Sequence, residues 1–351
     1  MILASSIEKV KNEANIVDVI TSTGIALKKK GSNYTCTCPF HNEKSASFSV
    51  DPSKQIYKCF GCGASGDSIK FLQEHKGFQF HEAIEWLAEK YNIALEYDGA
   101  TVTKEEKDEK KKALDFMGTV KRMYHDALRN NEAAMAYLTN RGFTTETIAL
   151  WELGYAPDAW RTITDYAIKN NCWDLAVKCG VCVESGEKNR DFFKNRIIIP
   201  ISDEKGNTIS FGGRIWTQDQ DDKKEPKYLN GPETFIYDKG KVLFGLYRAM
   251  SHINKQGAAY LVEGYFDVIM SHQYELNHVI AACGTGVTDW HVKSIVKRAK
   301  KIVLAGDNDA AGEKSILKSI DMFLEAGALQ VDVIEWPEGI KDIDQYLKQA
   351  I

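Results

Sequence analysis

Four potential metal ligands occur in the N-terminal part of the chain as two pairs with equal spacing. Two residues separate Cys38 from His41, and two separate Cys59 from Cys62. This gap lets a tight turn direct both side chains of a pair at one ion, and two such turns complete a tetrahedron of sulfur and nitrogen ligands. Because protein would fill all four positions, the pattern predicts a zinc ribbon with a structural zinc ion.

The other cysteines suit different roles. Cys36 could compete as a ligand, but it lacks the two-residue gap to His41. Cys179 and Cys182 repeat the spacing without a second pair, so we expect ordinary reduced thiols. Cys283 lies in an apolar run and is expected in a core.

Carboxylates that follow apolar runs form a second group of candidate ligands. Glu263 follows residues 258–262, and Asp307 and Asp309 follow residues 301–305. Ligands of open α/β sheets bind at the carboxyl ends of strands, so these side chains should lie at one edge of a sheet. Two carboxylates about 4 Å apart repel by about 4 kcal/mol at an effective dielectric constant near 20, which favours a divalent cation. Oxygen ligands with open positions suit Mg²⁺ or Mn²⁺.

Two such cations can activate an attacking hydroxyl and stabilise a pyrophosphate leaving group. The catalytic candidates are therefore Glu263, Asp307 and Asp309, and further candidate ligands are Asp267, Asp342 and Asp344. A lone Asp-x-Asp pair is more often a solvated strand end, but three carboxylate-bearing strand ends in one sheet favour a metal site. The segment 306–315 is not a phosphate-binding P-loop, because Glu313 separates the glycine from the lysine.

Basic, polar and aromatic residues form a third group. Lys and Arg bind phosphates, Asn can bond to bases or sugars, and aromatic rings among lysines can stack on single-stranded bases. The nucleic-acid or nucleotide candidates are Arg141, Lys194, Asn195, Arg196, Arg214, Lys227, Tyr228, Asn230 and Lys239, with Phe48, Tyr57 and Phe60 in the ribbon. The alternative is that each basic residue is an ordinary surface residue and that the aromatic rings pack the ribbon.

The first blocks of the chain carry the zinc ligands and the basic residues. Residues 1–102 form the expected zinc-ribbon domain, which includes a helix over 79–91. Residues 103–112 are almost all charged and are interpreted as a linker, although they also suit a solvated helix start. Residues 113–257 form a mixed α+β block, with expected helices over 114–128 and 132–138 and a β-hairpin over 193–214.

The last block, residues 258–351, alternates short apolar strands with helices. The expected strands are 258–262, 278–282, 301–305 and 330–334, and the expected helices are 266–274, 290–299 and 313–325. This alternation predicts a parallel sheet covered on both faces. The fold class is therefore α/β multidomain, with a zinc ribbon, a mixed α+β subdomain and a parallel α/β sheet.

Composition limits the class of protein further. The chain has 351 residues and eight cysteines, no apolar run reaches the length of about 18 residues that a membrane helix needs, and the start lacks a signal-peptide pattern. We expect a cytoplasmic protein without a membrane partner. The net charge of −4 does not exclude nucleic acid, because an acidic metal site and a basic track cancel in the sum.

These motifs resemble the bacterial DnaG-type primases in type and order. The resemblance rests on residues 14–20, 28–34, 38–44, 48–50 and 58–63 in the ribbon, on 141–143, 153–157, 194–197, 211–214, 227–233 and 239–247 in the middle, and on 262–268, 284–286 and 307–312 in a Toprim-like sheet. It covers nearly the whole chain.

The resemblance implies a function and residue roles. The activity would be DNA primase activity: template-directed synthesis of short RNA primers on single-stranded DNA from ribonucleoside triphosphates, with structural zinc and catalytic Mg²⁺ or Mn²⁺. Glu263 is similar to the family's catalytic glutamate, and Asp307, Asp309 and Asp342 or Asp344 to its metal ligands. The residues implied to hold template or incoming nucleotide are Arg141, Lys194, Arg196, Lys227, Asn230 and Lys239.

The chain departs from the family at a few positions. Ala46 stands in place of a usual proline, Asn308 in place of a common glycine, and Ile343 where proline often separates the last aspartates. The family's helicase-binding C-terminal domain is missing, which suggests a short phage- or plasmid-type primase or a trimmed fragment and leaves a replicative helicase as an open partner. The alternatives in function are a Toprim-type nuclease or strand-passing enzyme, and a non-catalytic DNA-binding protein.

Overall fold

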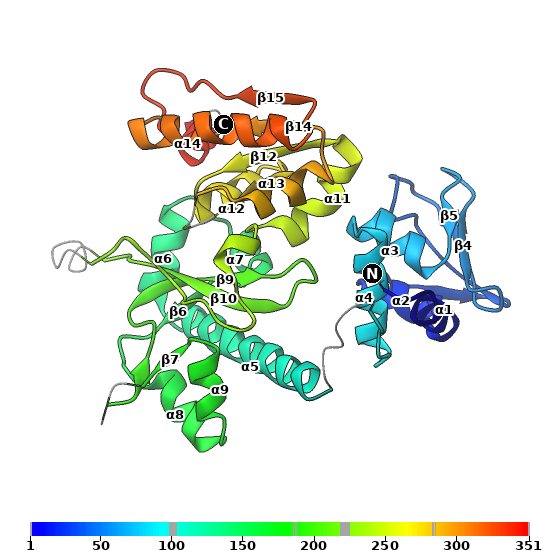
Figure 1. The fold of residues 1–351 in the computed structure, drawn as a ribbon, viewed down its shortest axis with the longest axis horizontal. Coiled ribbons are helices and arrows are strands. Elements are labelled where there is room, and N and C mark those ends of the chain that lie inside the picture. The colour runs from blue at the N-terminus through cyan, green and yellow to red at the C-terminus, as the bar shows by residue number, and fades with distance from the viewer. Residues whose placement is uncertain are drawn as a thin grey trace. The chain divides into compact units, whose positions relative to one another are not determined.

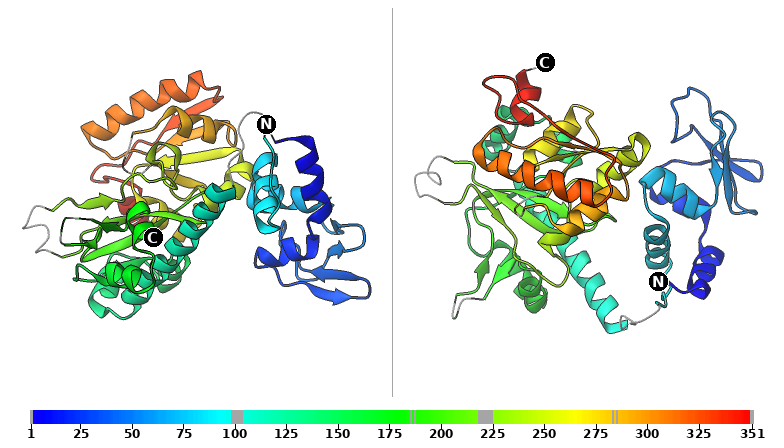
Figure 2. Two further views of the ribbon diagram at one scale, coloured as in Figure 1. Left: turned by 60° about the horizontal axis from the view of Figure 1, so that its bottom comes forward. Right: turned by 45° about the horizontal axis from the view of Figure 1, so that its top comes forward.

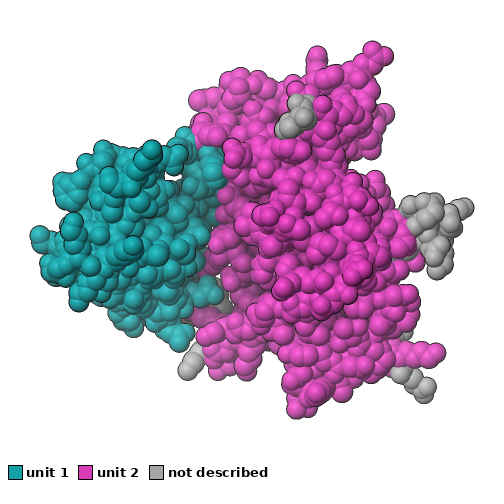
Figure 3. Space-filling model, turned by 180° about the vertical axis from the view of Figure 1, so that it is seen from behind, with its two compact units in different colours: residues 1–103, 250–255 teal, residues 104–249, 256–351 magenta. Residues whose placement is uncertain are grey.

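The computed structural model describes residues 2–97, 104–184, 186, 188–217, 225–282, 284 and 286–349. Two compact units make up the chain: Met1–Thr103 with Met250–Lys255, and Lys104–Ala249 with Gln256–Ile351 (Figure 3). Cys283, which the sequence places in a core, and Thr103, the first residue of the predicted linker, lie outside the described residues.

The first unit is an antiparallel sheet with four helices (Figure 1). The five strands lie in chain order and are β1 Lys28–Lys30, β2 Asn33–Cys36, β3 Phe48–Asp51, β4 Ile56–Cys59 and β5 Ser65–Gly66. The helices are α1 Ala4–Glu13, α2 Ile16–Ser22, α3 Ser68–Lys76 and α4 Phe80–Lys90. Helix α4 confirms the helix expected over 79–91.

Aromatic rings fill the interior of this unit. Strand alternation turns Phe48 of β3 and Tyr57 of β4 to the inner face, where their ring centroids lie 5.1 Å apart. Phe71 of α3 and Phe40 pack against both rings. Phe48 and Tyr57 are almost completely buried, so neither ring can stack on a base. The prediction that these two residues bind nucleic acid is wrong, and the alternative that they pack the ribbon is correct.

Helices and an antiparallel sheet form the first part of the second unit. The helices are α5 Lys104–Arg129, α6 Glu132–Asn140, α7 Thr145–Leu150, α8 Thr162–Lys169 and α9 Trp173–Lys178. The strands are β6 Gly154–Ala156, β9 Arg196–Ser202, β10 Thr208–Arg214 and β11 Tyr228–Asn230, in the order β11-β10-β9-β6, with a separate pair of β7 Cys182–Val183 and β8 Arg190–Asp191. Strands β9 and β10 confirm the expected hairpin.

The charged segment after the first unit is helical from Lys104 onward, where it forms the first turns of α5. The sequence suited both a linker and a solvated helix start, and the described residues form the helix start. Further along α5, buried residues such as Met117, Val120 and Tyr124 pack against the antiparallel sheet (Figure 1). The amphipathic part of the helix is therefore held by tertiary packing, whereas its first turns carry mainly charge.

The last part of the second unit is the expected parallel sheet. Its strands are β12 Ala258–Val262, β13 Val279–Ala281, β14 Lys301–Leu304 and β15 Gln330–Val333, in the order β13-β12-β14-β15. The remaining elements are η1 Lys239–Lys241, α11 Leu246–Gln256, α12 Tyr265–Gln273, α13 Asp289–Val296, α14 Ala310–Glu325 and α15 Ile343–Gln349.

Helices cover both faces of this sheet, as predicted. The chain moves from β12 to β13 in one direction and from β13 through β14 to β15 in the other, so right-handed crossovers place α12 on one face and α13 and α14 on the opposite face. Helix α15 packs on α12, and α13 on α14, which agrees with this assignment (Figure 2). The carboxyl ends of β12 and β14, neighbours in the sheet, thus bring Glu263 close to the segment that begins at Asp307.

Candidate functional site

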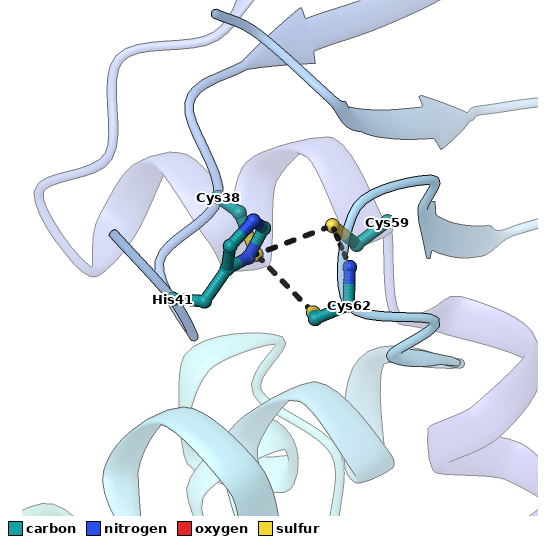
Figure 4. A group of neighbouring side chains, drawn as sticks. All are labelled: Cys38, His41, Cys59 and Cys62. Atoms are coloured by element: carbon teal, nitrogen blue, oxygen red, sulfur yellow. Dashed lines mark hydrogen bonds between the residues drawn. The ribbon is translucent and has the colours of Figure 1, made fainter. Parts of the chain in front are cut away.

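The two predicted pairs of zinc ligands lie together in the first unit. Cys38 and His41 follow β2, Cys59 ends β4, and Cys62 lies in the turn after it (Figure 4). Their ligand atoms all lie within 4.8 Å of one another, and the Sγ atoms of Cys38 and Cys62 are 3.8 Å apart. A tetrahedral ion with Zn–S bonds of about 2.3 Å requires an S···S distance of about 3.8 Å, so the residues fit zinc.

Glu43 holds the zinc ligands in place, and the sequence analysis missed it. Its Oε2 lies 3.3 Å from Nε2 of His41, while Nδ1 of the same ring faces the sulfur atoms. Its Oε1 accepts hydrogen bonds from the backbone amides of Cys38, at 2.7 Å, and Ser47, at 3.0 Å. A carboxylate behind a ligating histidine fixes the ring orientation. The available signal was a carboxylate two residues after a candidate ligand.

Hydrogen bonds also prepare Cys59 for a metal. Burial alone would raise the pKa of Cys59, but hydrogen bonds from Ser47 and from the amides of Cys62 and Gly61 lower it to about 6. The thiolate is the form that binds metal. Burial raises the pKa of Cys36 to about 11, and Cys36 lies outside the ligand group, as the sequence analysis preferred.

The predicted carboxylates gather at the carboxyl ends of the parallel strands in the second unit. Oε1 of Glu263 accepts a hydrogen bond from the amide of Asp307 at 3.1 Å. Asp267, in the first turn of α12, accepts one from the amide of Gly264 at 3.0 Å. Asp342 caps α15 by accepting from the amide of Gln345 at 2.8 Å. Backbone amides therefore orient three of these carboxylates at one edge of the sheet.

The two-residue spacing of Asp307 and Asp309 suits strand alternation, but a turn sets the directions of these side chains. The amide of Asp309 donates to the carbonyl of Asp307 at 2.8 Å, so the chain turns sharply between them. Oδ1 of Asp309 then accepts from the amide of Gly312 at 2.9 Å, at the start of α14. A turn, rather than an extended segment, keeps both carboxylates near Glu263.

Electrostatics show that these carboxylates interact. Burial, together with the negative charges of Asp342, Asp307 and Asp344, raises the pKa of Asp267 to about 7. Burial and the charges of Asp307 and Asp309 raise the pKa of Glu263. Like charges that crowd together raise each other's pKa values, and a divalent cation would relieve this repulsion.

The carboxylates are close, but they do not surround a single point as the zinc ligands do. Among the described residues, the four zinc ligands are the only group of three or more Cys, His, Asp or Glu side chains whose ligand atoms lie within 4.8 Å of one another. Oδ1 of Asp344 is buried without a hydrogen-bond partner in the described part of the chain. An unsatisfied buried carboxylate oxygen costs free energy, and a cation at this edge would satisfy it. The donor set fits Mg²⁺ or Mn²⁺.

Cations lie next to these carboxylates. Arg141 forms an ion pair with Asp344 at 3.2 Å, and Lys341 forms one with Asp307 at 3.2 Å. The guanidinium groups of Arg141 and Arg214 lie 5.1 and 5.0 Å from the centroid of the Phe266 ring. Burial and the positive charges of Arg214, Lys341 and Arg141 lower the pKa of Lys227. Arg141, Arg214 and Lys227, all predicted from the sequence, thus form one basic cluster with Lys341.

Two predicted nucleic-acid residues have other roles. Arg196 is 4% exposed, and its guanidinium pairs with Glu225 at 3.1 Å and donates to the carbonyl of Pro226. Asn195 uses its Oδ1 to accept hydrogen bonds from the hydroxyl of Tyr155 and the indole nitrogen of Trp216. The structure therefore corrects the prediction for Arg196, which stabilises the fold instead of facing a phosphate.

The remaining nucleic-acid candidates either have accessible side chains or hold a neighbouring side chain in place by a hydrogen bond. The hydroxyl of Tyr228 accepts a hydrogen bond from Arg214, and Oδ1 of Asn230 accepts one from Tyr265 at 2.9 Å. Lys239 lies in η1 at the start of the segment that leads to the parallel sheet. Phe60 is 72% exposed beside Lys58, which makes it the ribbon aromatic that can still meet a base.

Trp160 is a further candidate that the sequence analysis missed. It is 47% exposed, and both Arg190 and Lys194 place their charged groups 4.8 Å from its ring centroid. Lys194 also pairs with Asp158 at 2.9 Å. Exposed aromatic rings beside cations are typical of single-strand binding surfaces. Only the backbone hydrogen bonds from the amide of Asp191 to the carbonyl of Trp160 and from the amide of Asn195 to the carbonyl of Pro157 reveal this contact.

A pocket of about 320 Å³ opens beside Glu263, between the strand ends and helix α14. Its lining comes from β12, β14, the segment after β13, and α14. Several lining residues are small, namely Gly284, Gly286, Gly306 and Ser315. Glu263 thus faces space that a ligand can enter.

Zinc ribbon, mixed core and Toprim-type sheet together define a class of nucleic-acid enzymes, and comparisons with known proteins identify the family. The family "CHC2 zinc finger" matches residues 2–103, "DNA primase catalytic core, N-terminal domain" matches 123–250, and "Toprim-like" matches 260–347. A DNA primase of Clostridium acetobutylicum is 38% identical over 98% of this chain and 56% of its own length. A DNA primase of Aquifex aeolicus is 37% identical over 99% of this chain and 67% of its own length.

Comparison with solved structures also finds DNA primases. The zinc-binding and RNA polymerase domains of the Aquifex aeolicus primase match 99% of this chain and 83% of that chain, with 36% identity and a TM-score of 0.65. A DnaG primase catalytic domain bound to ssDNA matches 69% of this chain and 76% of that chain, with 29% identity and a TM-score of 0.63. The chain belongs to the bacterial DnaG-type DNA primase family.

Three further findings concern the length of the chain relative to its relatives, its helices and its cofactors. The chain spans 56% and 57% of the length of two curated relatives that it matches. No helix among the described residues is long and apolar enough to cross a membrane. Zinc and a divalent cation are the cofactors of this combination of domains.

Proposed function

We propose that this chain synthesises short RNA primers on single-stranded DNA from ribonucleoside triphosphates. The observation that carries the proposal is the meeting of two opposite clusters within one unit. The carboxylates Glu263, Asp267, Asp307, Asp309, Asp342 and Asp344 lie beside the basic cluster of Arg141, Arg214, Lys227 and Lys341. Template-directed nucleotidyl transfer needs this combination, because it handles a triphosphate together with divalent cations.

Each cluster has its own part in the proposal. The carboxylates would hold divalent cations, which would supply activation of the attacking hydroxyl and stabilisation of the pyrophosphate that leaves. Glu263 and the two aspartates after β14 are the catalytic candidates, because their oxygens line the open strand ends beside the pocket. The basic cluster binds the triphosphate and orients it toward this edge. Arg214 is preorganised for this task, because hydroxyl groups and aromatic rings fix its guanidinium.

The first unit presents the template in this proposal. Its zinc ion has four protein ligands and so no open position for chemistry. Phe60 and Lys58 lie together on the outer surface of the ribbon, where the ring can stack on a base and the lysine can contact a phosphate.

We also propose a division of the chain into domains: a ribbon over 1–102, a charged segment over 103–112, a polymerase core over 113–257 and a Toprim subdomain over 258–351. The proposed function does not include a replicative helicase as a partner. We propose that the chain acts in the cytoplasm.

The test is primer synthesis by the zinc-loaded chain on a panel of single-stranded templates with labelled ribonucleotides. We expect template-dependent products only with Mg²⁺ or Mn²⁺. Asp309→Ala should abolish them with an unchanged zinc content and a loss of only about 1 kcal/mol in stability, because Asp309 is exposed and only the hydrogen bond that it accepts from the amide of Gly312, at the start of α14, is lost. Asp321→Ala, on an exposed turn of the same helix α14, is the matched control and should retain full activity.

Two other outcomes would reject the proposal. Metal-dependent cleavage of DNA without nucleotides would identify a Toprim-type nuclease. Metal-independent binding with no product on any template would identify a DNA-binding protein without catalysis. Full activity of Asp309→Ala would show that the carboxylate site is assigned to the wrong residues.

A further inference from the structure

A row of side chains lies on one face of the antiparallel sheet beside the basic cluster. The strand register pairs Tyr155 with Ile197, Ile197 with Arg214, and Arg214 with Tyr228. Directly paired residues point to the same face of a sheet, so these four side chains form one row across β6, β9, β10 and β11. The row contains two tyrosines and one buried cation.

Trp216 lies next to this row, in the direction of the strands. It follows Arg214 by two residues, and the hydrogen bond from the amide of Ile215 to the carbonyl of Lys227, at 3.1 Å, continues the strand pairing past the end of β10. A spacing of two residues returns a side chain to the same face. The indole of Trp216 therefore lies beside the row, on the same face as Arg214, where it packs against the core and is partly exposed to solvent.

Three neighbours fix the indole. Its Nε1 donates to Oδ1 of Asn195 at 3.0 Å, and the hydroxyl of Tyr155 donates to the same oxygen at 3.0 Å. The rings of Tyr155 and Tyr137 meet the indole at centroid distances of 5.6 and 6.3 Å, with interplanar angles of 84° and 68°. Asn195 has a φ of 48°, in the left-handed region that Asn tolerates better than most residues. Asn195 is thus a positioning residue for Trp216.

The charge beside the indole favours an anionic strand. Arg214 is 7% exposed, and within the described residues its hydrogen bonds go to the hydroxyls of Tyr137 and Tyr228 and to no carboxylate. A buried guanidinium without a carboxylate partner keeps its positive field for an external anion. A rigid indole next to such a field has the two properties of a single-strand platform, a ring for the base and a charge for the phosphate.

We propose that Trp216 stacks on one base of a single-stranded nucleic acid that enters the catalytic unit, with Asn195 and Tyr155 holding the indole. This proposal rests on the proposed function and adds a binding position to it. An indole has one hydrogen-bond donor, and Asn195 takes it, so Trp216 recognises the ring of a base and not its hydrogen-bonding edge. The contact therefore contributes affinity without selecting a sequence.

The experiment measures fluorescence anisotropy of a dye-labelled 16-nucleotide single-stranded oligothymidylate with the zinc-loaded full chain. Stacking on one base contributes the equivalent of about 5- to 100-fold in affinity, so Trp216→Leu should weaken binding by about tenfold. Trp216→Phe should restore most of the loss, because phenylalanine keeps an aromatic face. Trp173→Leu, in the distant helix α9, is the matched control and should bind like the unmodified chain.

The salt dependence of DNA binding distinguishes the contribution of base stacking from that of contacts between charged groups and phosphates. The slope of log affinity against log salt should be unchanged in Trp216→Leu, because no phosphate contact is lost, and it should fall in Arg214→Met. An oligonucleotide of adenines should show an equal or larger loss than oligothymidylate, as expected for stacking on larger rings. Unfolding temperatures of all variants identify any general loss of structure, and Trp216→Phe keeps the test valid if the leucine variant is unstable.

The results distinguish this inference from the function on which it rests. If the unmodified chain binds and makes primers but Trp216→Leu binds equally well, stacking by Trp216 is refuted and the proposed function stands. If the unmodified chain neither binds single strands nor makes primers, both proposals fail. A loss that Trp216→Phe does not restore would also refute stacking, since it would mean that the indole acts through its hydrogen bond to Asn195.

Discussion

Two phenylalanines of the ribbon should respond to mutation in opposite ways. Phe48 is completely buried, and Phe60 is 72% exposed only twelve positions later. We expect Phe48→Ala to reduce the stability of the first unit and Phe60→Ala to reduce binding of single-stranded DNA. The pair tests whether burial or residue type decides the role of an aromatic side chain.

The structure sets the expected magnitudes. Phe48 stacks on Tyr57 and touches Phe40 and Phe71, so replacement by alanine leaves a cavity within a tight aromatic cluster and should cost about 3–5 kcal/mol. Phe60 touches mainly Lys58, whose Nζ lies 5.6 Å from the ring centroid. An exposed contact of this kind contributes about 0.5–1 kcal/mol, so Phe60→Ala should leave stability nearly unchanged. Loss of one stacked base should weaken DNA binding by about 5- to 100-fold.

Two assays measure these effects on the zinc-loaded full chain. Urea unfolding followed by zinc release reports the stability of the ribbon, and anisotropy of a labelled single strand reports affinity. Ile56→Ala, on the same exposed side of β4, controls for surface loss without an aromatic ring. The reasoning is refuted if Phe48→Ala unfolds at the same urea concentration as the unmodified chain. It is also refuted, for Phe60, if the affinity of Phe60→Ala equals that of Ile56→Ala.

Three further predictions concern single residues. Glu43→Gln should weaken zinc binding by about 10- to 100-fold, measured by competition with a chelating dye, because the carboxylate orients His41. Arg196→Met should lower the free energy of unfolding by about 3 kcal/mol without changing the salt slope of DNA binding, because Arg196 pairs with Glu225 and faces no phosphate. Cys59→Ser should impair initiation on particular templates while metal-dependent extension of a supplied primer persists; loss of extension would contradict the division of roles between the units.

Local spacing predicted those features that depend on short stretches of chain. The zinc ligands follow from two gaps of two residues, because a tight turn can be inferred without knowing the rest of the fold. The parallel sheet follows from apolar runs that alternate with helices, and β12 has the expected bounds. The position of Glu263 at a strand end was predictable for the same reason.

Features that depend on strand pairing or on the path of a turn were not predictable. Arg196 and Lys194 are both basic and share a neighbourhood in sequence, yet Arg196 is buried as the first residue of β9, whereas Lys194 precedes the left-handed Asn195 and lies beside Trp160. Asp307 and Asp309 have strand-like spacing, but a hydrogen bond between their backbones makes the segment turn. A list of basic and acidic residues therefore gives the composition of the site, and only the register shows which side chains face it.

The two metal sites differ in a way that supports separate roles for the units. The zinc ligands already lie at distances that suit a bound ion, held by Glu43 and by backbone amides, so this site needs little rearrangement to bind metal. The carboxylates at the strand ends stay farther apart, and cations such as Arg141 and Lys341 partly neutralise them. When substrate arrives with a metal ion, a site of this kind can release a protein cation from a carboxylate to a nucleotide phosphate, because the metal ion then offsets the charge of the carboxylates. Rigid ligands therefore suit the ribbon as a structural element, and adaptable carboxylates suit the proposed catalytic role of the second unit, in which the ligands would accommodate successive nucleotides.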